Sequence, residues 1–586
     1  MNWNLNYLFE TEEDFLKALN NLNSYVEKIA SFKGKLNDEK SFVELLMLQR
    51  DFEEAASRVY QYASLKSDLD KRNVNNLANL NKVQMVFYSL GEVASYIDPE
   101  LLTIGKEKVL KMVDNNPEIK EFRFLMERLF DQNDHILSSR EEELLSLYSP
   151  LTSKGSSLYS TLGVSDAKKV PVTLSDGRTV DVTKGNWTTL VQDSKNENDR
   201  RKIFEAHFST YEETKNTFAE IYKVCLDADK ASAKSRKYSS SVEAHLDHNK
   251  IPTSVYYNLV DVAGNNNASL KKYLKLKKDY LGLSTYHTYD RFLQLASSDK
   301  KYSYEDAKKM FFASIEKFPQ DFQDKAHEVL RDGFVDVMEK DGKRTGAYSS
   351  GVANLHPYIL LNHEGTLDSC FTVAHEAGHS IHTLYAQEAQ PTMLQDYTIF
   401  VAEIASTFNE HNLLDYLLNS GKLNKNEKIM MIQKAIDSIM STFYRQTLFA
   451  EYELKAHELN EQGQPINHEV LSNIMIDLYK KYYDIDIKEE KVKQYVWAYI
   501  PHLFYTPFYV YQYATSFAAS FKLYKDVKNN VPGAFDNYTK LLKSGGSKYP
   551  MDETKEAGVD FTKKETFMAV VERMDELVKE LEELLK

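Results

Sequence analysis

Apolar residues recur every three to four positions along most of the chain, which is the spacing of one face of a helix. The pattern is regular at 12–32 and at 41–65. It returns between 195 and 345 and again from 368 to the last residue, where 570–586 has the pattern of an amphipathic surface helix. The sequence therefore predicts a mainly α protein.

Two stretches depart from this helical pattern. At 170–182, two alternating apolar and polar runs flank Ser175-Asp176-Gly177, which indicates a β-hairpin. At 342–366, Gly, Ser and Pro become frequent, and PYILLN (357–362) reads as one strand between two loops, the first of which contains GAYSSG (346–351). We therefore expect a small β element in a helical protein.

Composition narrows the class of protein. The chain has 586 residues with only 21 Gly and 13 Pro, so helix breakers are few and a large core is available. The net charge of −14 argues against a nucleic-acid partner or an anionic membrane surface. The two cysteines do not make a disulfide framework. We see no signal peptide and no apolar run of the ~20 residues that a membrane span needs, so we expect a cytoplasmic location.

The predicted helix at 372–386 contains three histidines and a glutamate within eight residues. His375 and His379 are four apart, so they share a helical face and can hold one Zn²⁺. Glu376, one step round the helix, would point at a metal-bound water, which suits a general base. This is the HExxH pattern. The alternative is a helix whose histidines serve only packing or the surface.

An open catalytic zinc site takes three protein ligands. The HExxHxxGxxH class is excluded, because Tyr385 stands at its histidine position and His382 at its glycine position. The next helix contains Glu403 among apolar and small residues, which favours a carboxylate ligand, although a salt bridge is the alternative. Glu410, two turns further on the same face, could support a ligand from behind. We expect His382 to pack or to support rather than to bind metal.

A second cluster contains His502 and three tyrosines at intervals of four, Tyr505, Tyr509 and Tyr513. The tyrosines would share a helical face if Pro507 falls in the first turn of the helix. Phenol and imidazole protons that point at one place could stabilise a tetrahedral oxyanion. An aromatic core stripe is the alternative, since the chain has 38 tyrosines.

Four motifs follow one another along the chain: HEAGHSIH, FVAEIASTFNE, HLFYTPFYVYQYATS and LLKSGGSKYPMDETKEAGVDF. In this order they resemble the thimet-oligopeptidase-like zinc peptidases of family M3, and within that family the bacterial oligoendopeptidase F group. The resemblance covers most of the chain and is strongest over 345–565. It implies two helical lobes that enclose a deep substrate channel around a zincin-type catalytic core. We expect an N-terminal helical lobe at 1–195 and a catalytic domain at 196–586.

The resemblance also implies the roles of individual residues. One zinc per chain would be held by His375, His379 and Glu403, with Glu376 as general base. His502, Tyr509 and Tyr513 would bind the substrate and the oxyanion.

The expected function is a zinc-dependent endopeptidase that hydrolyses short oligopeptides by attack of a metal-bound water. The alternatives are a peptidyl-dipeptidase or carboxypeptidase of the same chemistry, and a peptide-binding protein without turnover. The intact Glu376 argues against the last. An extended peptide could pair with the strand at 357–362, which would suit broad specificity.

Overall fold

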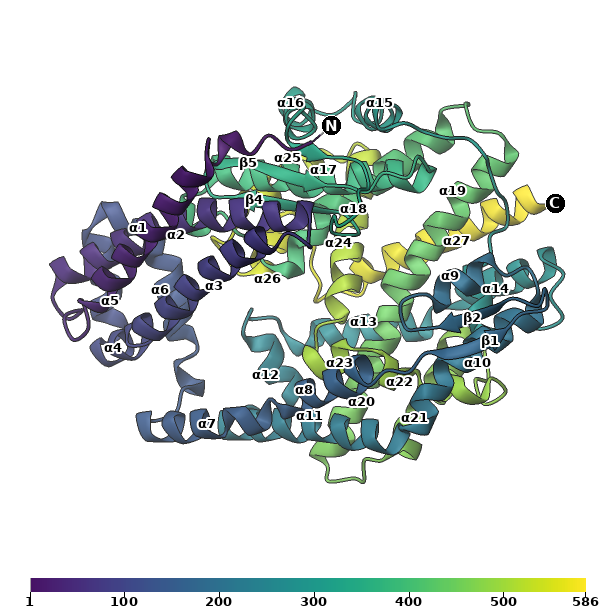
Figure 1. Cartoon of the computed structure of the whole chain (residues 1–586), viewed down its shortest axis with the longest axis horizontal. Helices are drawn as coiled ribbons and strands as arrows, with labels where there is room; N and C mark the ends of the chain where they lie inside the picture. The colour runs from purple at the N-terminus through teal and green to yellow at the C-terminus, as the bar shows by residue number, and fades with distance from the viewer. Residues whose placement is uncertain (1) are drawn as a thin grey trace. The chain divides into compact units, whose positions relative to one another are not determined.

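Most of the chain is helical, as the spacing of its apolar residues predicts (Figure 1). The computed structural model describes residues 2–586. It forms two compact units, each made of three segments of the sequence. Unit 1 comprises Met1–Asp134, Asp299–Ser420 and Leu523–Val559, and unit 2 comprises His135–Ser298, Gly421–Lys522 and Asp560–Lys586. The mainly α class is confirmed. The expected domain boundary between residues 195 and 196 does not coincide with a boundary of these units. The two expected domains and the substrate channel stay predictions.

The helices of unit 1 fall in all three of its segments. They are α1 (Glu12–Ala30), α2 (Glu39–Leu69), α3 (Val74–Ala94), α4 (Ile97–Ile104), α5 (Lys106–Asn115), α6 (Arg123–Asp131), α15 (Tyr304–Ser314), α16 (Gln320–Val329), α17 (Leu367–Ala389), α18 (Ile399–Asn419), α25 (Ala534–Ser544) and α26 (Pro550–Glu556). α24 (Tyr511–Lys528) begins in unit 2 and ends in unit 1.

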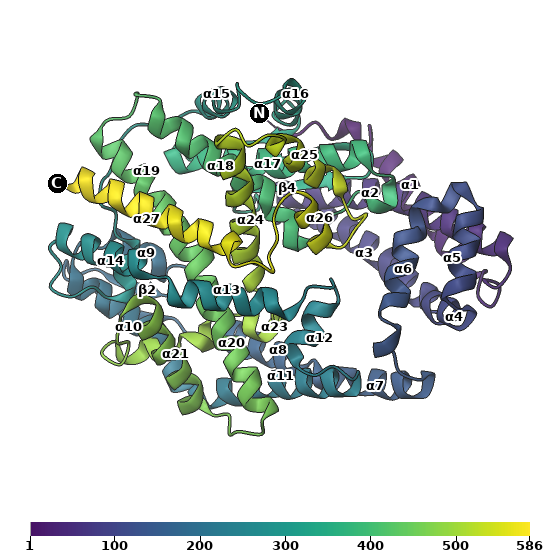
Figure 2. The ribbon, with the colours of Figure 1, turned by 180° about the vertical axis from the view of Figure 1, so that it is seen from behind.

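Unit 2 is built from helices of the middle and of the end of the chain. They are α7 (Ser139–Thr152), α8 (Lys154–Ser160), α9 (Trp187–Asp193), α10 (Glu197–Glu213), α11 (Lys215–Ser235), α12 (Ser241–Asp247), α13 (Thr253–Asn265), α14 (Ala268–Tyr280), α19 (Lys425–Ser438), α20 (Arg445–Glu461), α21 (His468–Tyr483), α22 (Val496–Tyr499), α23 (His502–Tyr505) and α27 (Glu565–Leu585). α27 packs against α14 and α19 (Figure 2), so the predicted C-terminal helix buries its apolar face.

The sheet of unit 1 has three strands, in the order β3 (Val335–Asp336), β5 (Leu355–Leu360), β4 (Tyr348–Val352). β5 corresponds to the strand expected at 357–362. It lies in the centre, parallel to β3 and antiparallel to β4. The idea that this strand pairs with a peptide is therefore wrong, because its backbone groups already bind two neighbours. The stretch expected as a loop, GAYSSG, instead supplies the edge strand β4.

The predicted hairpin is confirmed in unit 2. β1 (Val170–Thr173) pairs antiparallel with β2 (Thr179–Val182). Gly177 in the turn has φ +86°, a left-handed conformation that glycine adopts without strain.

The N-terminal segment of unit 1 packs onto the three-stranded sheet. The indole nitrogen of Trp3 donates to the carbonyl oxygen of Ile359 at 2.8 Å. Val352, Tyr358 and Leu360 share one buried cluster with apolar residues of α1, α2 and α3. α17 contacts β4 and β5 (Figure 1). The sheet thus lies against both the N-terminal helices and α17, which is the helix with the HExxH pattern.

Candidate active site

α17 presents the histidine pair on one face. The helix begins after Thr366, whose hydroxyl accepts the Ser369 backbone N–H at 3.1 Å, and it ends at Ala389, ahead of a proline. The ring centroids of His375 and His379 are 4.9 Å apart, as expected for neighbours one turn apart. The helix therefore places both imidazoles at one place.

α18 brings Glu403 to the same place. This helix packs directly on α17, and the Asn409 side chain donates to the carbonyl oxygen of Ala374 at 3.0 Å. Oε2 of Glu403 lies 3.4 Å from Nε2 of His375 and 3.4 Å from Nε2 of His379. Two atoms that each bind a tetrahedral zinc at ~2.0–2.1 Å are ~3.3–3.4 Å apart. The observed spacing fits one ion among the three side chains.

Among the described residues, this His-His-Glu set is the one group of His, Cys, Asp and Glu side chains arranged to hold a metal. Its ligand atoms all lie within 4.8 Å of one another. Two imidazoles and a carboxylate are a donor set of open catalytic zinc sites.

The other face of His375 contacts a second carboxylate. Oε1 of Glu410 lies 2.6 Å from Nδ1 of His375, which leaves Nε2 directed at Glu403. Such a contact fixes the ring orientation of a metal-binding histidine. His382 is fully buried and stacks on Tyr397, with ring centroids 3.6 Å apart. His382 is therefore packed in the interior, as the sequence led us to expect.

Opposing effects set the protonation of these groups. Burial lowers the pKa of His375, but the hydrogen bond and charge of Glu410 outweigh it and raise that pKa to about 9. Burial raises the pKa of Glu403, but contact with His379 and the charge of His375 lower it to about 2. The carboxylates of Glu403 and Glu410 thus make the site favourable for a positive charge.

Glu376 lies beside the His-His-Glu set, and one of its carboxylate oxygens has no partner within residues 2–586. Its side chain is 5% exposed, and Oε2 has no hydrogen-bond partner among the described residues. Burial raises the pKa of this carboxyl group, although the two histidines oppose the effect. A buried carboxylate oxygen without a partner is costly in a purely structural role.

These groups line a cavity of about 520 Å³ whose walls all belong to unit 1. One wall is the edge strand β4, through Tyr348, Ser349, Gly351 and Val352. A volume of several hundred Å³ is typical of ligand sites. The cavity can therefore take several residues of an extended chain beside the histidine pair.

Comparison with known families is decisive at this point. Residues 190–573 match the model of peptidase family M3, and residues 100–168 match an N-terminal model described as oligopeptidase F. The chain belongs to peptidase family M3. The matched range includes α17, α18 and the segment around His502, so the family assignment covers every predicted site residue of the M3 chain.

Relatives of this M3 peptidase align with its whole chain. Oligopeptidase PepF of Bacillus subtilis is 34% identical over 100% of this chain and 87% of its own length. Group B oligopeptidase PepB of Streptococcus agalactiae is 32% identical over 100% of this chain and 97% of its own. The crystal structure of oligoendopeptidase-F from Enterococcus faecium is similar with a TM-score of 0.76 and 28% identity, covering 98% of this chain and 99% of that one. The family and the fold are therefore shown along the full chain.

His502, Tyr509 and Tyr513 lie in unit 2, where their rings gather. His502 and Tyr509 stack with centroids 5.8 Å apart, and the Tyr513 hydroxyl is 3.5 Å from Nε2 of His502. The expected shared helical face is wrong, because α23 ends at Tyr505 and α24 begins at Tyr511. The chain turns between them, with Phe508 at φ +54°. This turn, rather than a continuous helix, brings the three rings together.

The turn has a buried anchor. Oε1 of Glu453, on α20, accepts the backbone N–H of Phe508 at 2.8 Å, and Glu453 is 1% exposed. This bond helps to stabilise the left-handed conformation of a bulky residue, which costs about 1–3 kcal/mol.

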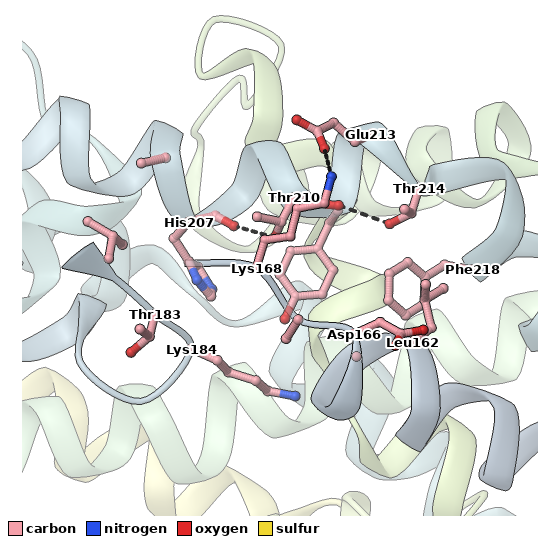
Figure 3. A pocket seen from close by; sticks show the side chains of 15 residues that line it. Leu162, Asp166, Lys168, Thr183, Lys184, His207, Thr210, Glu213, Thr214 and Phe218 are labelled. Atoms are coloured by element: carbon pink, nitrogen blue, oxygen red, sulfur yellow. Dashed lines mark hydrogen bonds and ion pairs between the residues drawn. The ribbon is translucent and has the colours of Figure 1, made fainter. Parts of the chain in front are cut away.

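Unit 2 contains a second cavity, between α10 and the loop after β2 (Figure 3). His207 and Lys184 line it, and Lys168 pairs with Glu213 at 3.2 Å. Its volume of about 60 Å³ holds a few waters and no peptide. The cavity of unit 1 is therefore the candidate substrate site.

Several residues of that cavity were not singled out from the sequence, among them Glu53, Asp396 and Tyr397. Glu53 lies on an amphipathic helix, α2, some three hundred residues before α17 and α18. Its flanking residues, Phe52 and Glu54, are ordinary for an amphipathic helix, so no local signal distinguishes it. Tyr397 could have been suspected from its position a few residues before Glu403.

None of the helices in the described part of the chain combines the length and hydropathy of a membrane span.

Proposed function

We propose that this M3 peptidase is a zinc-dependent metallo-oligoendopeptidase that cleaves short oligopeptides internally. His375, His379 and Glu403 would hold one zinc, and Glu376 would act as general base. The convergence of three ligand atoms beside the unpartnered oxygen of Glu376 carries this proposal.

Bound zinc supplies a Lewis acid that polarises a carbonyl group and acidifies water. Glu376 then accepts a proton from the attacking water and passes it to the leaving amine. Its place one residue after His375 keeps the carboxylate beside the ligands without making it one. Glu410 holds His375 in the orientation that directs Nε2 at the metal position.

Substrate would lie in the cavity against β4. This strand has a strand neighbour on its β5 side alone among the described residues, so its outer edge can pair with an extended peptide. Main-chain pairing is independent of sequence, which suits a broad peptidase. The names of the relatives, oligopeptidase and oligoendopeptidase, support short peptides as the substrate class. His502, Tyr509 and Tyr513 would bind the substrate and the oxyanion. A cytoplasmic location stays part of the proposal.

Metal analysis tests the ligand set. We expect one zinc per chain in the wild type and loss of zinc and activity in His375→Ala, His379→Ala and Glu403→Ala. Glu376→Gln should keep its zinc but lose at least ~10²–10⁴-fold in kcat, because glutamine cannot accept the proton. His327→Ala, at an exposed histidine of α16, is the control and should keep both. A full equivalent of zinc in the three ligand variants would contradict the assignment.

Product analysis separates internal cleavage from C-terminal trimming. Peptides with free and with amidated C-termini are digested, and the products are identified by mass spectrometry. Internal cuts in amidated peptides are the expected result. Products shortened only from free C-termini would instead identify a carboxypeptidase or peptidyl-dipeptidase, and binding without any products a peptide-binding protein.

A further inference from the structure

The cavity of unit 1 contains two carboxylates that the proposed chemistry does not use. Glu53 projects from α2, and Asp396 lies in the segment between α17 and α18. Neither forms an ion pair or a side-chain hydrogen bond within residues 2–586. Both residues are exposed to the solvent of the cavity. Partial desolvation there raises the pKa of both carboxyl groups, and the charge of Asp396 raises that of Glu53 further. The two groups are therefore like charges that share one space without a cation.

The neighbouring Glu54 shows what a structural carboxylate on the same helix does. Its Oε1 accepts from Nδ2 of Asn354 at 3.1 Å and from the Thr392 hydroxyl at 2.6 Å. Glu54 does not line the cavity. Of two consecutive glutamates, one is used by the fold and the other faces the cavity.

A second observation points to a ligand in this cavity. Oε2 of Glu376 is buried without a hydrogen-bond partner, and Glu376 lines the same cavity. Strand β4 lines this cavity as well. A peptide that lies along β4 and reaches Glu376 shares the cavity with Glu53 and Asp396.

We propose that Glu53 and Asp396 form a subsite that binds a cationic group of the peptide, an ammonium or a guanidinium. The inference rests on the proposed function, because it requires the peptide to occupy this cavity. A cation between the two carboxylates removes their mutual repulsion and makes charge-assisted hydrogen bonds to both. The cation can come from a lysine or arginine side chain or from the N-terminus of the peptide.

Peptides of one length test the subsite and separate its two sources of charge. A neutral peptide, acetylated and amidated, is compared with versions that carry one lysine at successive positions and with a version that has a free N-terminus. We expect at least one charged version to be preferred about tenfold in kcat/KM, the effect of one hydrogen bond to a charged group. The arm in which the preference appears identifies the source. The preference should shrink as salt is added.

Variants assign the preference to the two carboxylates. Glu53→Gln and Asp396→Asn should bring the ratio of charged to neutral kcat/KM towards one, and Glu53→Lys should turn it in favour of a peptide with a glutamate at the same position. The control Glu54→Gln should keep the wild-type ratio. Equal kcat/KM for all peptides in the wild type, or a ratio unchanged in both Glu53→Gln and Asp396→Asn, would overturn the inference.

Equilibrium binding provides a readout that does not depend on turnover. Calorimetry on Glu376→Gln compares a lysine peptide with the same peptide acetylated on that lysine, or a free with an acetylated N-terminus. Tighter binding of the charged form, lost in Glu376→Gln combined with Glu53→Gln, supports the subsite. If the wild type cleaves no peptide but this difference is present, the proposed function fails and the subsite stands. Equal binding of charged and acetylated forms refutes the subsite.

Discussion

A methyl group on Gly378 would lie 2.5 Å from the carbonyl oxygen of Ala405. The same methyl would lie 2.6 Å from Cα of Ser406. Gly378 stands next to His379 on α17, and Ala405 stands two residues after Glu403 on α18. The bare glycine therefore lets the two helices approach closely at the level of His379 and Glu403, and it helps to set the distance between the histidine pair and Glu403.

We predict that Gly378→Ala destabilises the protein and weakens zinc binding. The new methyl meets backbone atoms, which cannot rotate away, so α18 must shift; such overpacking costs about 1–3 kcal/mol. Denaturant unfolding and zinc titration measure the two effects. Gly91→Ala on α3 is the control, because nothing lies within 4 Å of its added methyl. It should stabilise by about 0.5–1 kcal/mol, as alanine usually does in a helix. Normal stability and zinc affinity of Gly378→Ala would disprove the close-approach argument.

Glu410 is predicted to act as a positioning residue. Glu410→Ala removes the partner of His375 Nδ1, so we expect zinc affinity to fall about 10–100-fold. Glu410→Gln still offers an acceptor and should recover part of the loss. Competition with a chelator measures the affinities. The matched control is Glu388→Gln. Glu388 lies on the same helix as His375 and pairs with Lys325 at the surface, so its replacement should leave zinc affinity unchanged. Equal affinities in all variants would show that Glu410 serves packing only.

Glu553 on α26 should make stability depend on pH. It is 3% exposed, and burial raises its pKa to about 8, with Lys548 opposing the shift. Because the folded pKa lies above that of an unfolded glutamate, ~4.3, the contribution of this group is fully present below pH ~4 and is lost as the pH rises towards 8.

Replacing Glu553 by glutamine removes that titration. Glu553→Gln should therefore be more stable than the wild type at pH 8 by a few kcal/mol at most, and the gain should shrink towards pH 5. Guanidinium unfolding at several pH values measures the difference. The control is Glu556→Gln, since Glu556 is exposed and pairs with Lys548 at 2.6 Å. A Glu553→Gln gain that is the same at pH 5 and pH 8 would contradict the assignment.

Local patterns were sufficient to predict the helices, the hairpin and the histidine pair. The four-residue spacing of His375 and His379 is a property of one helix, and Glu403 and Glu410 follow in the next helix at two-turn spacing. In each case a single helix determines which side chains share a face. The mainly α class and the M3 family were also predictable, because the first depends on regular periodicity and the second on motifs in a fixed order. Both are confirmed.

Contacts between segments that are far apart in the sequence could not be predicted from local patterns. Nothing in PYILLN reveals that it pairs on both sides, or that the Gly- and Ser-containing stretch before it forms the edge strand. Glu53 and Asp396 are more than three hundred residues apart and meet only because the N-terminal helices pack on the sheet. The interruption between Tyr505 and Tyr511 was also missed, because Phe508 adopts a left-handed conformation that its own sequence does not favour.

The tyrosines of unit 2 provide the last test. The structure brings Tyr509 and Tyr513 together with His502, which is compatible with both oxyanion binding and aromatic packing. An oxyanion donor strengthens its hydrogen bond in the transition state, so its loss lowers kcat and leaves KM nearly unchanged. We expect Tyr509→Phe or Tyr513→Phe to lose ~10²–10³ in kcat with an unchanged melting temperature, and His502→Ala to lose a similar factor. Tyr511→Phe is the control, because Tyr511 is 2% exposed and packs on Tyr256 with centroids 5.0 Å apart. It should cost about 0.5–1.5 kcal/mol of stability and leave kcat alone. If the variants of Tyr509, Tyr513 and His502 behave like the control, the cluster is a packing element and the oxyanion donor must be sought among other side chains.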